Sequence, residues 1–535
     1  MPCMPRSRMG ATESLSPINQ KRASLALHPE FPYPDPMASL LPPTAAELKQ
    51  RALDVHRRLA GKLSVVAKEP VLGPADLALL YTPGVAEPCR EIALRREAVY
   101  EYTGKGNLVA VISDGTAVLG LGDIGPEAGL PVMEGKALLF KEFAGIDAVP
   151  LVLGTKDPAI IISTIKALAP SFGGINLEDI SAPRCFEIEK ALQEALDIPV
   201  FHDDQHGTAI VVLAALTNAA KKVGKEFSTL KTVVNGAGAA GTAITRLLLA
   251  AGLSDVTVCD REGVLKAGDS KLNSAMAELA SVTNPRGLSG DLATALAGAD
   301  VFIGVSAPGV LTGDHVKSMA PGAVIFAMAN PDPEIRPAEA KAAGAALVAT
   351  GRSDFPNQIN NVLAFPGVFR GALAVRARRV TQPMKLAAAR AIAALAGTGP
   401  EGPDAIVPSA FHRELVFQVA LAVASAALAD GVADRKLDRS LLVQTIQEGL
   451  IEAGAHRTLR TRHHLAQAGG ASRRIQERIG EGLVRIGFLT QEQSDEILVL
   501  QASGDKRLFG EIALALGFLD FDTLIDYLRR PGGSA

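Results

Sequence analysis

The feature that most constrains this chain is a glycine-rich run between a predicted strand and a predicted helix. The run is Gly236-Ala237-Gly238-Ala239-Ala240-Gly241; a predicted strand at residues 232–235 precedes it, and residues 242–251 have helical spacing. In such a loop the first glycine permits a tight turn, the second lets the backbone approach a pyrophosphate, and the third allows close helix packing. The helix N-terminus adds free amides and the positive end of its dipole. The run therefore predicts a dinucleotide site in a Rossmann-type, doubly wound parallel sheet.

Two residues at the end of the next predicted strand bear on the choice of cofactor. Asp260 lies about twenty residues beyond the loop, where a carboxylate accepts hydrogen bonds from a ribose hydroxyl and repels a 2′-phosphate. Arg261 follows directly and could instead pair with a 2′-phosphate. Asp260 favours NAD, and Arg261 leaves NADP open.

The length of 535 residues exceeds what one ordinary core holds, so several parts are expected. Short apolar runs alternate with helical spacing in two series, which predicts an α/β fold with parallel sheets. We expect a tail at 1–40, an N-terminal α/β catalytic domain at 41–217, a dinucleotide-binding domain at 218–434, a linker at 435–470 and a small all-α module at 471–535.

Composition narrows the classes of function. The formal net charge of -3 gives no field that favours nucleic acid or an anionic membrane. No apolar run reaches the eighteen residues of a membrane span. The four cysteines include no CxxC pair, so a zinc knuckle or disulfide framework is not indicated. We expect a soluble, cytoplasmic protein whose partners are small molecules or other proteins.

Carboxylates follow two successive predicted strands in the first series. Residues 174–177 lead into Glu178-Asp179, and residues 198–201 lead, past His202, into Asp203-Asp204. In open α/β sheets, ligands bind outside the carboxyl ends of the strands. Three or four carboxylates at one edge would suit a hard divalent cation, Mg²⁺ or Mn²⁺.

This segment has two other interpretations. His202 and His206 have the HxxxH spacing of a zinc hydrolase helix. The preceding run at 198–201 is typical of a strand, so the two rings need not share a helix face. The acids could also be helix caps, since Asp204 precedes a helical stretch, but capping accounts for one acid and not four.

Six separate motifs resemble the malic enzymes. They are YTPGVAEP, SDGTAVLGLGDIG, PVMEGKALLF, INLEDI, VFHDDQHGTA and QINNVLAFPG, they occur in this order, and the resemblance covers residues 45–434. It implies a metal-dependent and nicotinamide-dependent enzyme that oxidises L-malate and decarboxylates it to pyruvate and CO2. It also implies a homo-oligomer, a dimer or larger.

The resemblance implies roles for single residues. Tyr81 matches the family's general acid, and Lys136 matches its general base, with Asp203 supporting the lysine. The residues that match the metal ligands are Glu178, Asp179 and Asp204.

Two asparagines, Asn330 and Asn361, match residues that hold the malate carboxylates, with Asn360 as an alternative register for Asn361. Ala117 stands where larger eukaryotic members have a substrate-binding arginine. The cation that would pair with the second malate carboxylate is therefore not identified.

Beyond residue 434 the resemblance ends, and a repeat with a spacing of thirty residues appears. Gly480-Glu481-Gly482-Leu483 with Gly487-Phe488-Leu489 recurs as Gly510-Glu511-Ile512-Ala513 with Gly517-Phe518-Leu519. A capping Thr or Asp opens the helix that follows each copy. The pattern predicts two similar helical hairpins and looks like the small helical repeats at the N-termini of type II secretion ATPases. A stabilising tail and a docking module for a protein partner both remain open.

Two alternative functions remain beside the main one. The chain could be a metal-dependent oxaloacetate decarboxylase with little dehydrogenase flux, or a silent scaffold that presents the C-terminal module. Fold alone does not separate these.

Overall fold

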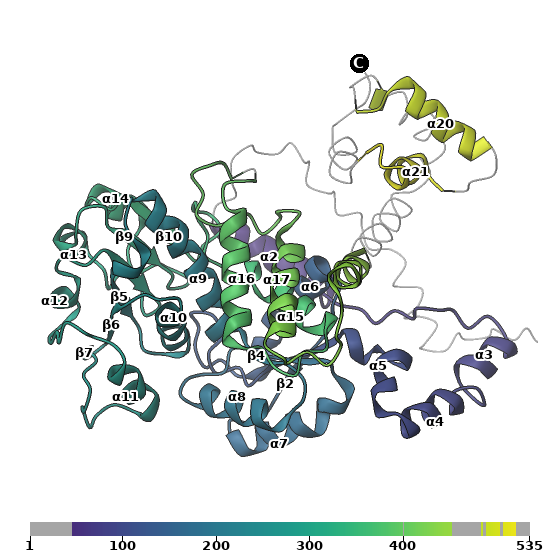
Figure 1. The fold of residues 1–535 in the computed structure, drawn as a ribbon, viewed down its shortest axis with the longest axis horizontal. Helices are drawn as coiled ribbons and strands as arrows, with labels where there is room; N and C mark the ends of the chain where they lie inside the picture. The colour runs from purple at the N-terminus through teal and green to yellow at the C-terminus, as the bar shows by residue number, and fades with distance from the viewer. Residues whose placement is uncertain (1–44, 400, 452–482, 485–487, 503–506, 520–535) are drawn as a thin grey trace, which may run out of the picture. The chain divides into compact units, whose positions relative to one another are not determined.

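The computed structural model describes residues 45–399, 401–451, 483–484, 488–502 and 507–519 (Figure 1). By its internal contacts the chain divides into two units, Met1–Gly61 and Lys62–Ala535. In the first unit the described element is α2 (Ala45–Leu59), where Asp54 accepts hydrogen bonds from Gln50 and Arg57. The helix ends at Leu59, because Ala60 (φ 50°) and Gly61 (φ 119°) adopt positive φ angles.

The first sheet has four parallel strands in the order β2-β1-β3-β4. They are β1 (Leu108–Ser113), β2 (Asp147–Val152), β3 (Gly174–Leu177) and β4 (Val200–His202). Their flanking helices are α6 (Pro126–Ala144), α7 (Pro158–Leu168) and α8 (Arg184–Ala195). Of the two strands predicted before the acids, the one at 174–177 has the predicted bounds, whereas the one at 198–201 is shifted to Val200–His202.

The second sheet has six strands in the order β10-β9-β8-β5-β6-β7. They are β5 (Lys231–Asn235), β6 (Asp255–Asp260), β7 (Gly263–Val264), β8 (Val301–Gly304), β9 (Val324–Ala327) and β10 (Leu347–Thr350). All pairs are parallel except β6 with the short β7. The direction of the strand order changes between β5 and β8, and in open α/β sheets ligands bind outside the carboxyl ends of the strands at such a point. The predicted Rossmann-type sheet is confirmed.

Helices connect most strands of the second sheet, although β7 follows β6 directly and two helices lie between β7 and β8. The helices of this sheet are α10 (Ala239–Ala250), α11 (Ser274–Ser281), α12 (Leu292–Leu296), α13 (Gly313–Ser318) and α14 (Pro337–Ala342). The shorter helices elsewhere are α3 (Pro74–Leu80), α4 (Ala86–Leu94), α5 (Val99–Tyr102), η1 (Arg96–Ala98), η2 (Gly104–Asn107), η3 (Ala169–Ser171), η4 (Phe227–Thr229) and η5 (Asn361–Leu363).

Four helices tie the two sheets together. The long α9 (Asp203–Lys222) begins at the end of β4 and packs against α10 of the second sheet. After β10 the chain returns through α15 (Phe365–Ala374), α16 (Gln382–Leu395) and α17 (Leu415–Ala429), drawn in green in Figure 1. Phe365 and Phe369 of α15 meet the Phe140 ring of α6 at centroid distances of 4.7 and 5.1 Å. This shared core fixes the ends of the first sheet beside the second.

The C-terminal repeat has a regular backbone within the described residues. Phe488 and Leu489 donate their amides to the carbonyl of Leu483, and Phe518 and Leu519 donate theirs to Ala513, thirty residues on. Thr490 and Gln493 cap the following α20 (Gln491–Ala502) reciprocally, as predicted. The second copy contains α21 (Phe509–Ala515), while Gly480 to Gly482 and Gly487 lie outside the described residues.

Within the described part of the chain, no helix combines the length and the apolar character that crossing a membrane would need.

Candidate functional site

The predicted acids converge where β3 and β4 end side by side. Glu178 and Asp179 follow β3, and Asp203 and Asp204 form the first turn of α9. One ligand oxygen each from Glu178, Asp179 and Asp204 lies within 4.8 Å of the others. Asp179 adopts φ 54°, an uncommon conformation for a residue with a side chain, and its amide donates to Asp204 Oδ2 at 2.8 Å. The two strand ends are therefore bonded directly across the cluster.

Lys136 of α6 lies against this cluster. Its Nζ donates to Asp203 Oδ2 at 2.5 Å, lies 3.0 Å from Glu178 Oε1, and stands 4.3 Å from the centre of the Phe365 ring. Burial alone would lower the pKa of Lys136, but Asp203 and Glu178 together raise it above its usual value. Within this structure Lys136 is therefore a protonated cation held between two carboxylates.

If all three clustered acids were ionised, they would carry more negative charge than Lys136 compensates, which disfavours their ionised forms. Burial, with added repulsion from Asp204 and Glu178, raises the pKa of Asp179 to about 9. Burial likewise raises the pKa of Glu178 to about 7 and that of Asp204 to about 6. Asp179 Oδ2 is buried and lacks a hydrogen-bond partner among the described residues. An all-oxygen set with a missing counter-charge fits a hard divalent cation.

The histidines of this segment are used differently. His202 is the last residue of β4, and burial lowers its pKa to about 4, so it is neutral at pH 7. His206 bonds Glu189 through Nε2 at 2.9 Å and Lys385 through Nδ1 at 3.0 Å. Among the described residues, the three acids are the only group of three or more His, Cys, Asp or Glu side chains spaced to share an ion. The arrangement disfavours the zinc hydrolase interpretation.

The capping interpretation of Asp204 also differs from the structure. The residue that precedes the first turn of α9 is His202, and Asp204 lies inside that turn. Its carboxylate accepts the amide of Asp179, which follows strand β3. The side chain of Asp204 therefore links α9 to the residues after β3 and does not cap the helix.

The dinucleotide loop has the predicted geometry. Gly236 has φ 119°, and a Cβ there would lie 2.6 Å from the carbonyl of Val305. A Cβ at Gly241 would lie 1.7 Å from the carbonyl of Gly236, whereas one at Gly238 would meet no atom within 4 Å. α10 begins at Ala239, directly after the loop, and the first amides of a helix have no partner within the helix. The loop fits a pyrophosphate.

Asp260 ends β6, and its Oδ1 accepts the amide of Glu262 at 2.8 Å. Arg261 is exposed beside it. The structure thus brings both predicted selectivity residues to the end of the same strand.

The two predicted substrate asparagines lie on different elements: Asn330 on the loop after β9, and Asn361 at the start of η5. A Cβ at Gly120 would lie 1.8 Å from the carbonyl oxygen of Asn330, so the loop after β1 packs directly on Asn330. A Cβ at Gly207 would meet both Asp203 and the Cβ of Asn361. The Asn360 side chain is occupied, because its Oδ1 accepts the amide of Val362 at 2.9 Å. This geometry favours Asn361 over Asn360 as the residue beside the cluster.

Tyr81 is the predicted residue that the structure does not bring to the cluster. It follows α3, and its side chain is 65% exposed. Among the described residues no hydrogen bond, ion pair or ring contact joins it to the acids or to Lys136.

Two buried acids that the sequence analysis missed hold the site together. Glu189 accepts the amide of His202 at 3.0 Å and Gln205 Nε2 at 3.1 Å, which fixes the junction that carries Asp203 and Asp204. Burial would raise the pKa of Glu189, yet His206 and Lys385 lower it to about 2. The helical spacing of the sequence could have predicted its burial, because Glu189 lies on the apolar face of α8 with Ile188 and Leu192.

Glu334 is the second missed acid. Its buried carboxylate accepts the amides of Ser306 and Ala329 at 3.0 and 2.9 Å, and so joins the loops that follow β8 and β9. Asn330 follows Ala329 directly, so Glu334 fixes the backbone that presents it.

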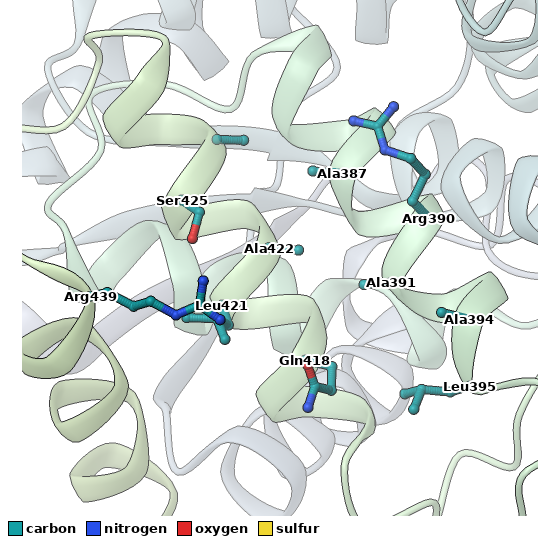
Figure 2. Close-up of a pocket in the computed structure, with 11 residues that line it drawn as sticks. Ala387, Arg390, Ala391, Ala394, Leu395, Gln418, Leu421, Ala422, Ser425 and Arg439 are labelled. Atoms are coloured by element: carbon teal, nitrogen blue, oxygen red, sulfur yellow. The ribbon is translucent and has the colours of Figure 1, made fainter.

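An open groove of about 530 Å³ lies elsewhere, between α16 and α17. Figure 2 shows its alanine-rich floor, with Arg390 and Arg439 on opposite sides. None of its lining residues belongs to the acid cluster or to the dinucleotide loop. The groove therefore has no part in the chemistry considered below.

Comparison with known proteins gives matches over most of the chain. Residues 60–193 match the N-terminal domain of malic enzymes, and residues 205–428 match the malic enzyme NAD-binding domain. An NAD-dependent malic enzyme of Geobacillus stearothermophilus is 56% identical over 375 residues, 70% of this chain and 78% of that protein. An NADP-dependent malic enzyme of Halomonas elongata is 48% identical over 418 residues, 75% of this chain and 98% of that protein.

A solved structure agrees with this. The crystal structure of malic enzyme from Pyrococcus horikoshii Ot3 has a TM-score of 0.73 and 47% identity, and the match covers 77% of this chain and 97% of that one. The matched family domains end at residue 428, before the C-terminal repeat.

Proposed function

The chain belongs to the malic enzyme family, and from this premise we propose that it oxidises L-malate and decarboxylates it to pyruvate and CO2 while reducing NAD or NADP. The observation that carries the proposal is the position of Lys136. It is buried between Asp203 and Glu178, beside a group of acids that lacks a compensating positive charge. The carboxylate of Glu178 contacts Lys136 and belongs to the proposed metal site, so the base and the metal would lie side by side. This arrangement suits a hydroxy acid such as malate, in which the hydroxyl that must lose a proton is next to a carboxylate of the substrate.

Glu178, Asp179 and Asp204 would hold the divalent cation, and residues 236–241 would hold the cofactor pyrophosphate. The cation supplies polarisation of the C2 oxygen of malate, which lowers its proton affinity and stabilises negative charge there when CO2 leaves. The nicotinamide supplies the hydride acceptor.

Lys136 is the group that moves the first proton. To accept the C2 hydroxyl proton, its Nζ must first be neutral, and Asp203 at 2.5 Å is placed to take the proton that Nζ gives up. Burial raises the pKa of Asp203 to about 7, so the carboxyl can hold that proton near neutral pH. A positive charge at the neighbouring acids would further lower the proton affinity of Lys136.

Asn330 and Asn361 would orient the substrate, since amide groups hydrogen-bond carboxylates without adding charge. After CO2 departs, C3 requires a proton, and we assign this step to the phenol of Tyr81. Protonation at C3 completes pyruvate.

The decisive experiment follows cofactor reduction at 340 nm with L-malate and Mn²⁺, in parallel with NAD and with NADP, and assays pyruvate in the same samples. We expect metal-dependent reduction with one pyruvate per reduced cofactor, abolished by EDTA and restored by excess Mn²⁺. Reduction without pyruvate would contradict the decarboxylating step.

The alternatives have their own outcomes. Consumption of oxaloacetate with Mn²⁺ but no reduction of either cofactor with malate would identify a decarboxylase. Absence of both activities in protein that still binds Mn²⁺ would favour the scaffold.

A further inference from the structure

The groove between α16 and α17 has the features of a contact surface. Its volume is about 530 Å³, and small side chains such as Ala391 and Ala422 form its floor (Figure 2). Arg390 and Arg439 are exposed on opposite sides of this floor. Within the described part of the chain, neither guanidinium has a hydrogen-bond or ion-pair partner. The groove therefore places an apolar surface between two positive charges.

The side chains that line the groove limit what it can hold. The distance between two packed helices depends on the side chains at their contact, so a floor of alanines lets a third helix approach closely. The two arginines favour an occupant with negative charges, because opposite charges across an interface fix its register. The groove thus suits a helix whose exposed face has an apolar centre and acidic sides.

Helix α20 of the C-terminal repeat has an exposed apolar face. Its Ile497 is buried in the core of the repeat, whereas Leu498 and Val499 are 51% and 65% exposed. Among the described residues this core contains seven buried hydrophobic side chains. A core of this size stabilises a domain only weakly, so the repeat would gain stability if a neighbouring surface covered the two exposed side chains.

Acidic side chains lie on both sides of Val499. Successive residues of a helix point about 100° apart around its axis, so Asp495 and Glu496, one turn before Val499, flank it. Asp495 accepts a hydrogen bond from Gln491 of the same helix at 2.9 Å. Where the structure describes the chain, neither acid has an ion-pair partner. The exposed face of α20 therefore has an apolar centre between two negative charges, which is the complement of the groove.

We propose that α20 docks in the groove between α16 and α17 of the same chain, with its apolar face on the alanine floor and its two acids facing the two arginines. Residues 439–451 are helical and begin at the groove, and residues 452–482 connect them to the repeat. A connection of about thirty residues reaches up to about 100 Å, so its length permits the contact. It also raises the effective concentration of α20 at the groove, which favours the same chain over a second copy.

A single tryptophan can report the docking, because the chain has none of its own. Val499→Trp in the full-length protein places the indole at the centre of the proposed contact. If α20 is docked, the indole is shielded from water, so its emission should lie at shorter wavelength and acrylamide should quench it less. Val282→Trp, at an exposed position outside both surfaces, is the control and should behave as a free indole. Equal emission and quenching in the two variants would overturn the proposal.

Charge reversal separates docking in the groove from shielding by the repeat itself. In the tryptophan reporter protein, Arg390→Glu/Arg439→Glu should move the emission to longer wavelength and increase quenching. Adding Asp495→Lys/Glu496→Lys should restore both readings, because the facing charges are opposite again. Lys317→Glu, at an exposed position on α13, is the control and should change neither. An unchanged signal after reversal of the arginines, or no restoration by the second reversal, would contradict the proposed contact.

Mixing two proteins distinguishes docking within one chain from docking on a second copy. The reporter chain with Arg390→Glu/Arg439→Glu has a free α20, and a chain without tryptophan that carries Asp495→Lys/Glu496→Lys has a free groove. We expect no change in emission when the two are mixed, since the proposed contact depends on the connection within each chain. A shift to shorter wavelength on mixing would assign the groove to a second copy and overturn the same-chain contact. None of these readings depends on malate turnover, so they stand apart from the test of the proposed function.

Discussion

The dinucleotide loop and the acid cluster are built by opposite means. The loop works by removing side chains, since Gly236 and Gly241 leave no room for a Cβ and Gly238 leaves open space. The cluster instead brings side chains close together, with four acids at the ends of two strands and Lys136 of α6 against them. The geometry of the loop therefore forms without a ligand, whereas the acids of the cluster lack a compensating positive charge until a cation binds. The two regions should respond differently to mutation, metal and pH.

The largest expected effect is at the lysine of the cluster. Lys136→Ala removes the proposed base and should lower kcat with malate by about 10³-fold, because positioned acid–base groups contribute about 10²–10⁴-fold. Binding of the reduced cofactor, followed by its fluorescence, should survive, since the loop belongs to the other sheet. Lys141→Ala on the same helix, where the side chain bonds Asp147, is the matched control. A variant at residue 136 with near-normal turnover would remove the base assignment.

The metal response should depend on pH in the direction set by the raised carboxyl pKa values. The pKa of Asp179 is raised to about 9 and that of Glu178 to about 7, so both hold protons in the folded metal-free protein where unfolded carboxyls are ionised. Between pH 6.5 and 8 these groups make the metal-free protein less stable as pH rises. A cation must displace their protons, so the rise in Tm caused by Mn²⁺ should be larger at pH 8 than at pH 6.5.

Asp204→Ala tests the same point with a matched control. It should abolish both the Mn²⁺-dependent rise in Tm and metal-dependent turnover, whereas Asp123→Ala, at an exposed acid paired with Lys156, should retain both. An undiminished Mn²⁺ response in Asp204→Ala would count against its role as a ligand.

The glycines of the loop should separate into two classes. Gly238→Ala places a methyl group in open space, so Tm should be unchanged while the cofactor KM rises by about tenfold through the blocked approach of the pyrophosphate. Gly241→Ala places a Cβ 1.7 Å from the carbonyl of Gly236, so it should lower Tm as well. Equal Tm values for the two variants would contradict this division.

The same contrast explains what the sequence could predict. The loop lies in one continuous run, and the acids follow adjacent strands whose ends must meet, so both were predictable from local patterns. The bonds of Glu189 to the β4–α9 junction and the return of Phe365 and Phe369 to α6 depend on contacts between distant segments. The exposure of Tyr81 was unpredictable for the same reason, because its motif specifies a turn but not the surface that the turn meets.

The smallest expected effect lies at the end of β6, where the charged side chains of Asp260 and Arg261 would face the ribose of the bound cofactor. Asp260→Ala removes the carboxylate that would repel a 2′-phosphate, while Arg261 remains beside it to attract one. We expect kcat/KM with NADP, relative to NAD, to rise by about tenfold, which corresponds to about 1.4 kcal/mol. Since Asp260 also accepts the amide of Glu262, Asp260→Asn is the control that can preserve this bond without the charge. If both variants shift the ratio equally, charge determines selectivity; if only Asp260→Ala does, the shape of the turn does.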